Sequence, residues 1–116
     1  MELENPARRV FFGLEYEELF DGAVLALALC GFEVKEADKS SGRITAVAPV
    51  SRWSWGEIIK VSVSMANERV IVDAHSKSRI PVQIDHWGKN KRNINDFFAV
   101  LTIQTQMRKA SRDQEE

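Results

Sequence analysis

The sequence predicts an α+β domain in which two helices pack on one face of an antiparallel sheet of four or five strands. Two observations carry this prediction. Four segments between residues 32 and 76 alternate apolar and polar side chains, which is typical of strands that are buried on one face only. Two other segments, one before and one after these strands, repeat apolar residues at three- and four-residue steps, the period of an amphipathic helix.

The chain is expected to begin with a short strand and a helix. The strand covers residues 7–12, Ala-Arg-Arg-Val-Phe-Phe, and Gly13 ends it. The helix spans Leu14–Cys30 and carries acidic residues in its first turn, where the helix dipole favours negative charge. Gly31 can adopt the left-handed conformation that stops a helix. The apolar face of this helix comprises Tyr16, Leu19, Phe20, Ala23, Val24 and Leu27.

Four strands follow, joined in part by tight turns. The predicted strands are Phe32–Ala37, Arg43–Ala48, Glu57–Met65 and Arg69 to His75 or Ser76. Residues 38–42 and 66–68 have the composition of turns. The inward side chains are predicted to be Phe32, Val34, Ile44, Ala46, Ala48, Ile59, Val61, Val63, Met65, Val70, Val72 and Ala74. Both helices are expected on this apolar face, because each needs a surface that buries its own stripe.

The last helix is predicted to begin near Asn90 or Asn93, since asparagine is a good N-cap. Its apolar face comprises Ile94, Phe97, Phe98, Leu101 and Thr105, with Val100, Ile103 and Met107 beside it. The length fits a single domain over residues 1–116. Residues 1–6 and 109–116 are polar and charged, and we expect them to fray.

The element order β-α-β-β-β-β-α resembles the helix-grip arrangement, in which a curved antiparallel sheet wraps a C-terminal helix. A ferredoxin-like fold is the main competitor, but it would need a strand within residues 109–116, which cannot supply one. A second resemblance is carried by Gly31-Phe32, the Asp38–Gly42 turn, Ile44-Thr45-Ala46, Ser76–Arg79, Asp85, Gly88, Asn90, Arg92 and Ile94. These residues resemble the domain of unknown function 1499 family of small prokaryotic domains. More distantly, the layout resembles outer-membrane assembly lipoprotein C-type modules. The resemblance implies a fold and no established activity.

Composition excludes several classes of protein. The formal net charge of −1 argues against a domain that binds nucleic acid with its whole surface. Cys30 is the only cysteine and cannot form an internal disulfide, and its apolar neighbours indicate a small buried residue. The apolar run 23–29 is too short to span a bilayer. We therefore expect a cytoplasmic protein with no membrane span, and neither cofactor nor metal.

Catalysis is not favoured by the residues available. The histidines, His75 and His86, do not form with Asp73 and Asp85 the closely spaced set that zinc requires. Strand alternation places Asp73 and His75 on one face and Ser76 on the other, which breaks a Ser-His-Asp constellation. We assign no catalytic residue, and the question of enzymatic activity stays open.

Two loops are the candidate binding surface. Trp53 and Trp55 lie two apart in the segment 49–56, so both rings point the same way and either cover the open end of the core or anchor a partner. The other loop runs into the last helix and is basic. The predicted ligand- or partner-binding residues are Trp53, Trp55, Trp87, Lys89, Asn90, Lys91 and Arg92.

The leading hypothesis is a non-enzymatic binding or protein-interaction module whose partner is a protein or a small ligand. The alternative is a phosphate- or nucleic-acid-contacting module that uses Lys89, Lys91 and Arg92 of the basic loop before the last helix, since the backbone amides at a helix N-terminus attract phosphate. Nucleic acid is the less favoured partner. A structural reading competes with both: Asp85 and Asn90 hydrogen-bond the loop backbone, Trp87 plugs one end of the core and the cations are solvated.

Overall fold

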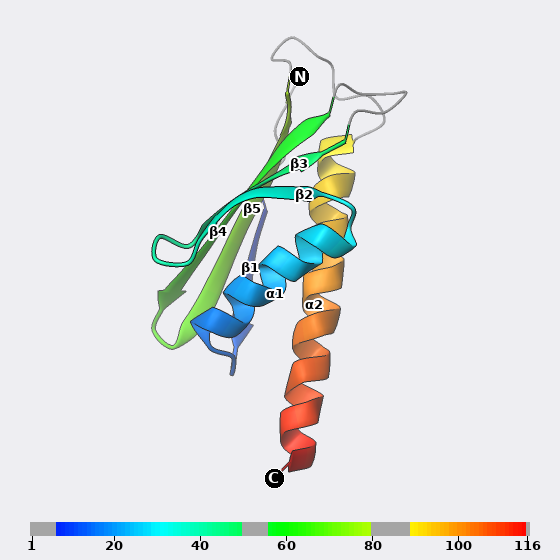
Figure 1. Cartoon of the computed structure of the whole chain (residues 1–116). Helices are drawn as coiled ribbons and strands as arrows, with labels where there is room; N and C mark the ends of the chain where they lie inside the picture. The colour runs from blue at the N-terminus through cyan, green and yellow to red at the C-terminus, as the bar shows by residue number, and fades with distance from the viewer. Residues whose placement is uncertain (1–6, 50–55, 80–88, 116) are drawn as a thin grey trace.

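The computed structural model describes residues 7–49, 56–79 and 89–115, which form a five-stranded sheet and two helices (Figure 1). The elements are β1 (Ala7–Phe12), α1 (Tyr16–Leu29), β2 (Glu33–Asp38), β3 (Arg43–Ala48), β4 (Glu57–Ala66), β5 (Arg69–Ser78) and α2 (Lys89–Glu115). The predicted α+β class and element order are confirmed, and the layout is helix-grip-like.

The strands are arranged in the order β1-β5-β4-β3-β2, and every neighbouring pair is antiparallel. The β4–β5 hairpin is the longest pair, with 10 residues in each strand. Its turn residues Asn67 and Glu68 have φ angles of 53° and 67°. Two consecutive positive φ angles are the mark of a type I′ turn, whose twist matches that of the flanking strands.

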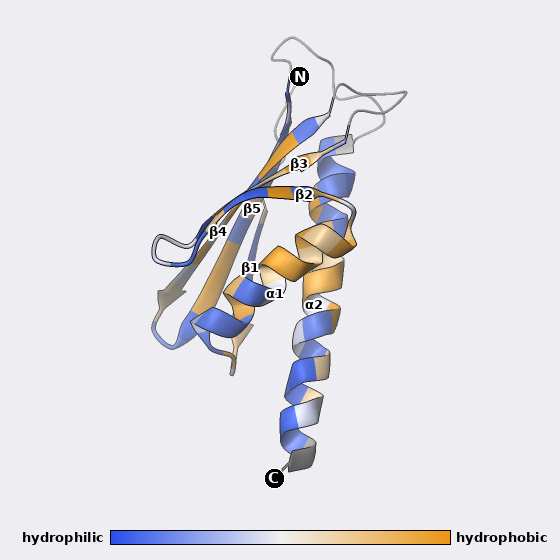
Figure 2. Cartoon of the chain, in the orientation of Figure 1, coloured by the Kyte–Doolittle hydropathy of each residue, from blue (hydrophilic) through white to orange (hydrophobic). Residues whose placement is uncertain are grey.

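Both helices cover the same face of the sheet, as predicted (Figure 1). Figure 2 shows apolar residues concentrated in α1 and the middle of α2, whereas the last turns of α2 are hydrophilic. The helices and the inward side chains of the strands share one core. It contains Leu14, Leu19, Phe20, Ala23, Ala26, Leu27, Phe32, Ile44, Ala46, Ala48, Ile59, Val61, Val63, Val70, Val72, Ala74, Ile94, Phe97, Phe98 and Leu101.

Three details differ from the sequence-based expectation. Met65 is predicted to lie inside but is 54% exposed, because the pairing of β3 with β4 ends at Ser62 and leaves Met65 with a strand neighbour on one side only. Strand β5 continues to Ser78, two residues beyond the predicted end. The helix α2 starts at Lys89, so Asn90 and Asn93 lie within its first turns instead of before them.

The helix α2 also continues over residues that the sequence predicts to fray. A charged clamp holds this part of α2 against the start of α1. Arg112 Nη1 lies 2.8 Å from Glu18 Oε1, and Arg112 Nη2 donates a hydrogen bond of 2.6 Å to the carbonyl oxygen of Gly13. The clamp adds polar contacts between the two helices to the apolar contacts that they share in the core.

Candidate functional site

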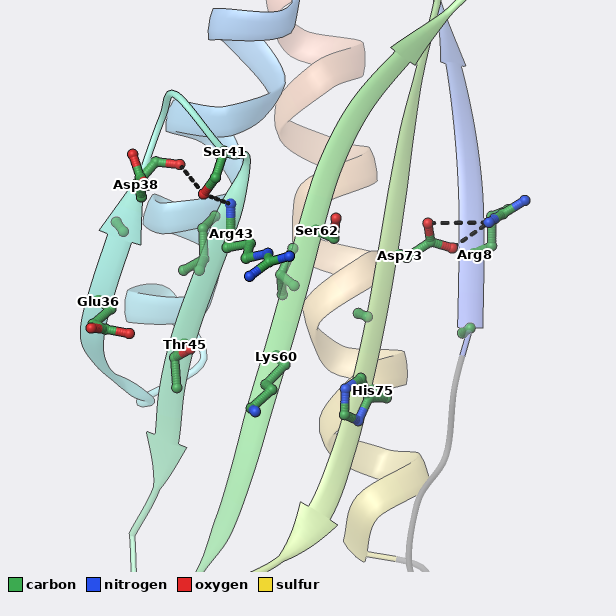
Figure 3. A pocket seen from close by; sticks show the side chains of 15 residues that line it. Arg8, Glu36, Asp38, Ser41, Arg43, Thr45, Lys60, Ser62, Asp73 and His75 are labelled. Atoms are coloured by element: carbon green, nitrogen blue, oxygen red, sulfur yellow. Dashed lines mark hydrogen bonds and ion pairs between the residues drawn. The ribbon is translucent and has the colours of Figure 1, made fainter.

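The sheet face opposite the helices is polar and hollowed. A hollow of about 1020 Å³ lies over its centre, and Figure 3 shows the side chains that project into it on the side away from the helices. We call it the outer hollow. Its polar lining residues are Arg8, Glu36, Asp38, Ser41, Arg43, Thr45, Lys60, Ser62, Asp73 and His75.

The strand register aligns most of these side chains in two rows across the sheet. The first row is Glu36, Thr45, Lys60 and His75, from β2 to β5. The second row is Asp38, Arg43, Ser62, Asp73 and Arg8, from β2 to β1. Directly opposed residues have Cβ atoms roughly 5 Å apart, so each row is a continuous polar strip.

Two acids of the second row already have partners. Arg8 Nε donates to Asp73 Oδ1 at 2.6 Å, and Arg8 Nη2 lies 3.3 Å from Asp73 Oδ2; this hydrogen bonding raises the pKa of Arg8. The carboxylate of Asp38 accepts hydrogen bonds from the hydroxyl of Ser40 at 2.7 Å and from its backbone N–H at 3.1 Å. The serine hydrogen bonds lower the pKa of Asp38.

Two cations occupy the middle of the outer hollow. Arg43 on β3 and Lys60 on β4 are diagonal neighbours, because Arg43 is paired with Ser62 and Lys60 with Thr45. Figure 3 shows both side chains in the space over β3 and β4. In the part of the chain that the structure describes, neither the guanidinium of Arg43 nor the ammonium of Lys60 makes a hydrogen bond or an ion pair.

The tryptophans predicted to form a binding surface, Trp53, Trp55 and Trp87, lie outside the described residues. The chain positions that bound their segments can be placed, however. The backbone N–H of Arg79 donates a hydrogen bond of 3.1 Å to the carbonyl oxygen of Gly56. One boundary of each segment is therefore at the same end of the sheet.

The basic residues predicted as a site lie at the start of α2. Lys89 is the first residue of the helix, and Lys91 and Arg92 are exposed in its first turn. Asn90 is fully buried, and its Oδ1 accepts a hydrogen bond of 2.7 Å from the hydroxyl of Ser76. The structural reading of Asn90, a side chain bonded within the protein, is therefore compatible with this contact to β5.

A buried polar network joins α2 to the sheet. Asn93 Nδ2 donates to Glu57 Oε1 at 2.9 Å and lies 3.3 Å from Ser76 Oγ. Both serines of the strand end, Ser76 and Ser78, point inward and are buried. Ser76 thus lies on the opposite face from His75, as the alternation predicts, and is used to fix the position of α2 and not in the outer hollow.

The remaining reactive side chains do not suggest another site. Cys30 is half-buried, and burial raises the pKa of its thiol, with the charge of Asp96 acting in the same direction. Within residues 7–49, 56–79 and 89–115, no three His, Cys, Asp or Glu side chains gather as a metal would require. Neither helix of this part is apolar over a stretch that could cross a membrane.

Comparison with protein-family models gives no match, and comparison with curated proteins gives none either. Among solved structures, the chain is similar to the crystal structure of Ara h 8.0201, with a TM-score of 0.47 and 11% sequence identity. The match covers 86% of this chain and 97% of that one. The layout of the chain is established by its own elements and strand pairing.

Proposed function

We propose that the chain is a non-enzymatic binding module that holds a small polar ligand in the outer hollow. The observation that supports this most is the alignment of two polar rows across a face of the sheet that no described helix covers. The volume of about 1020 Å³ matches the clefts that take small molecules. Side chains on strands are held more rigidly than side chains on loops, which lowers the entropic cost of binding.

The outer hollow supports binding better than catalysis. Asp73 is the acid next to His75 on this face of β5, but its carboxylate is bonded to Arg8. Ser76 lies on the opposite face of the sheet. A nucleophile, base and orienting acid in series are therefore not assembled from these residues.

The surface indicated by the sequence is the second candidate. Its proposed contacts are Trp53, Trp55, Trp87, Lys89, Asn90, Lys91 and Arg92, with a protein or small ligand as partner, or phosphate and nucleic acid in the basic variant. The hydrogen bond between Arg79 and Gly56 favours it, since one boundary of each loop segment meets the other there. The exposure of Lys91 and Arg92 also favours it. The proposed relationship to the domain of unknown function 1499 family rests in part on Asn90 and Arg92, which are also contacts of this second candidate.

A blocking variant tests the outer hollow. Ser62 projects into its centre, whereas Ser64 points the same way from β4 but is not part of the lining. We expect small polar fragments, screened by amide chemical-shift changes, to perturb β3, β4 and β5. Ser62→Phe should abolish these shifts, and the matched control Ser64→Phe should preserve them. Shifts confined to the start of α2, or unaffected by Ser62→Phe, would favour the second candidate instead.

A further inference from the structure

We infer that the ligand of the outer hollow is a small oxyanion held by Arg43 and Lys60. This inference rests on the proposed function and names the class of ligand. The charges around the hollow supply the first step. Of its acids, Asp73 is occupied by Arg8, and Asp38 is turned towards the β2–β3 turn, where it bonds Ser40.

The third acid, Glu36, is a diagonal neighbour of Arg43, but it forms no ion pair with either central cation in the described part of the chain. In the first row Thr45 stands between Glu36 and Lys60, so two strand spacings, roughly 10 Å, separate their backbones. Arg43 and Lys60 are thus diagonal neighbours of like charge with no ion pair among the described residues. A bound anion would remove the repulsion between them, and this gain is available only to a negatively charged ligand.

Hydroxyl groups complete the proposed site. Lys60 lies opposite Thr45, and Arg43 lies opposite Ser62, so each cation has a hydroxyl as its cross-strand neighbour. Neither hydroxyl is hydrogen-bonded to another residue in the described part of the chain. A planar guanidinium, an ammonium and two free hydroxyl donors are the groups that bind the oxygens of phosphate or carboxylate.

The acids limit the size of the ligand. The lining contains three basic residues, Arg8, Arg43 and Lys60, and three acids, Glu36, Asp38 and Asp73. A nucleic acid laid across the hollow would bring its phosphates close to Glu36 and Asp73, which a long polyanion cannot avoid. A compact di- or trivalent oxyanion needs to approach only Arg43 and Lys60, and the carboxylate of Asp38, opposite Arg43, is hydrogen-bonded to Ser40. The balance of charges therefore favours a small ligand over nucleic acid.

The test is a titration of the whole chain with inorganic phosphate and with citrate, at constant ionic strength maintained with sodium chloride. Saturable chemical-shift changes are expected at the amides of residues 43, 45, 60 and 62, with a rise in Tm. Arg43→Gln and Lys60→Gln should each weaken binding by about tenfold or more. Both residues are exposed, so the variants should fold, which far-UV circular dichroism would check. The matched control Lys109→Gln, an exposed lysine of α2 outside both candidate surfaces, should bind normally.

The outcomes separate the sources of the anion and the two proposals. Tighter binding of phosphate would indicate a phosphoryl ligand, and tighter binding of citrate a carboxylate ligand; either supports the inference. No saturable shift with either anion overturns it, as does binding that survives both Arg43→Gln and Lys60→Gln. If neutral fragments still bind and Ser62→Phe still blocks them, the oxyanion inference fails while the proposed function stands.

Discussion

Ser76 and Ser78 point into the same core from the same strand, yet their hydroxyls have different surroundings. Ser76 donates to Asn90 and lies within hydrogen-bonding distance of Asn93. Ser78 Oγ is buried without a partner in the described part of the chain. The hydrogen-bonded serine should therefore contribute to stability, whereas the other should contribute little or nothing.

We predict that Ser76→Ala lowers the free energy of unfolding by about 1–3 kcal/mol, because it leaves the buried amides of Asn90 and Asn93 without one of their partners. Ser78→Ala is the matched control and should be neutral or slightly stabilising. Urea unfolding of the three proteins measures both effects. Equal losses from the two substitutions would contradict the network.

Two glycines, Gly42 and Gly31, allow the cost of a steric collision to be distinguished from the cost of backbone strain. Gly42 has a φ of +79°, and a Cβ there would collide with the carbonyl oxygen of Val63 and approach the Tyr16 hydroxyl at 2.9 Å. Gly31 has a φ of +86°, but nothing lies within 4 Å of its Cβ position. Both are left-handed, so they differ in the space available for a side chain.

Gly42→Ala should therefore cost about 3 kcal/mol or more, since the collision adds to the strain of a left-handed alanine. Gly31→Ala should cost only the strain, about 1–2 kcal/mol. Thermal unfolding of both variants tests this difference. If the two alanines cost the same, β4 would have to move away from the β2–β3 turn without penalty.

At the scale of the elements, periodicity was enough to predict each strand and helix, but not how the strands align. Alternation places Thr45, Lys60 and His75 on outward faces of three different strands. Only the register of the β3–β4 and β4–β5 pairs brings them into one row. The outer hollow was therefore missed, although its residues could be recognised individually as outward and polar.

The clamp between α1 and α2 was also missed, because its partners are far apart in sequence. Glu18 accepts a hydrogen bond of 2.9 Å from the backbone N–H of Glu15, and it pairs with Arg112. Burial alone would raise the pKa of Glu18, but the Glu15 hydrogen bond, the contact with Arg112 and the charge of Arg108 lower it below its ordinary value of 4.5. A lowered pKa in the folded state means that the ionised carboxylate stabilises the fold.

Glu18→Gln should reduce the free energy of unfolding by about 1–2 kcal/mol near pH 7. The contribution of Glu18 is complete above pH 4.5 and is lost as the pH falls through its folded-state pKa. The difference between the native protein and the variant should therefore shrink below that pH. Chemical denaturation across pH 3–7 measures the difference. The control is Glu17→Gln, because Glu17 is exposed in the same turn of α1. A difference in the free energy of unfolding between the native protein and Glu18→Gln that does not change with pH would contradict the clamp.

At the scale of the whole molecule, α2 is bound to the rest of the chain in three successive regions. The polar network holds its first turns to β4 and β5, the shared core holds its middle, and the Arg112 clamp holds its end to α1. The middle includes a close approach of the helices, since a Cβ on Gly22 would lie 3.4 Å from Leu101 Cδ1. These attachments should make α2 unfold together with the sheet and not separately.

The prediction for the whole molecule is that a cavity in the middle of α2 destabilises every element equally. Phe97 is fully buried, whereas Ile103 on the same helix is 56% exposed. Phe97→Ala should cost about 3–5 kcal/mol and Ile103→Ala about 0.5 kcal/mol or less. Far-UV circular dichroism, which follows the helices, and near-UV circular dichroism, which follows tertiary packing, should still give coincident transitions in Phe97→Ala. An earlier loss of helical signal would mean that α2 separates from an intact sheet. In that case the outer hollow, which is built from the strands and the β2–β3 turn, should keep binding its ligand after α2 has unfolded.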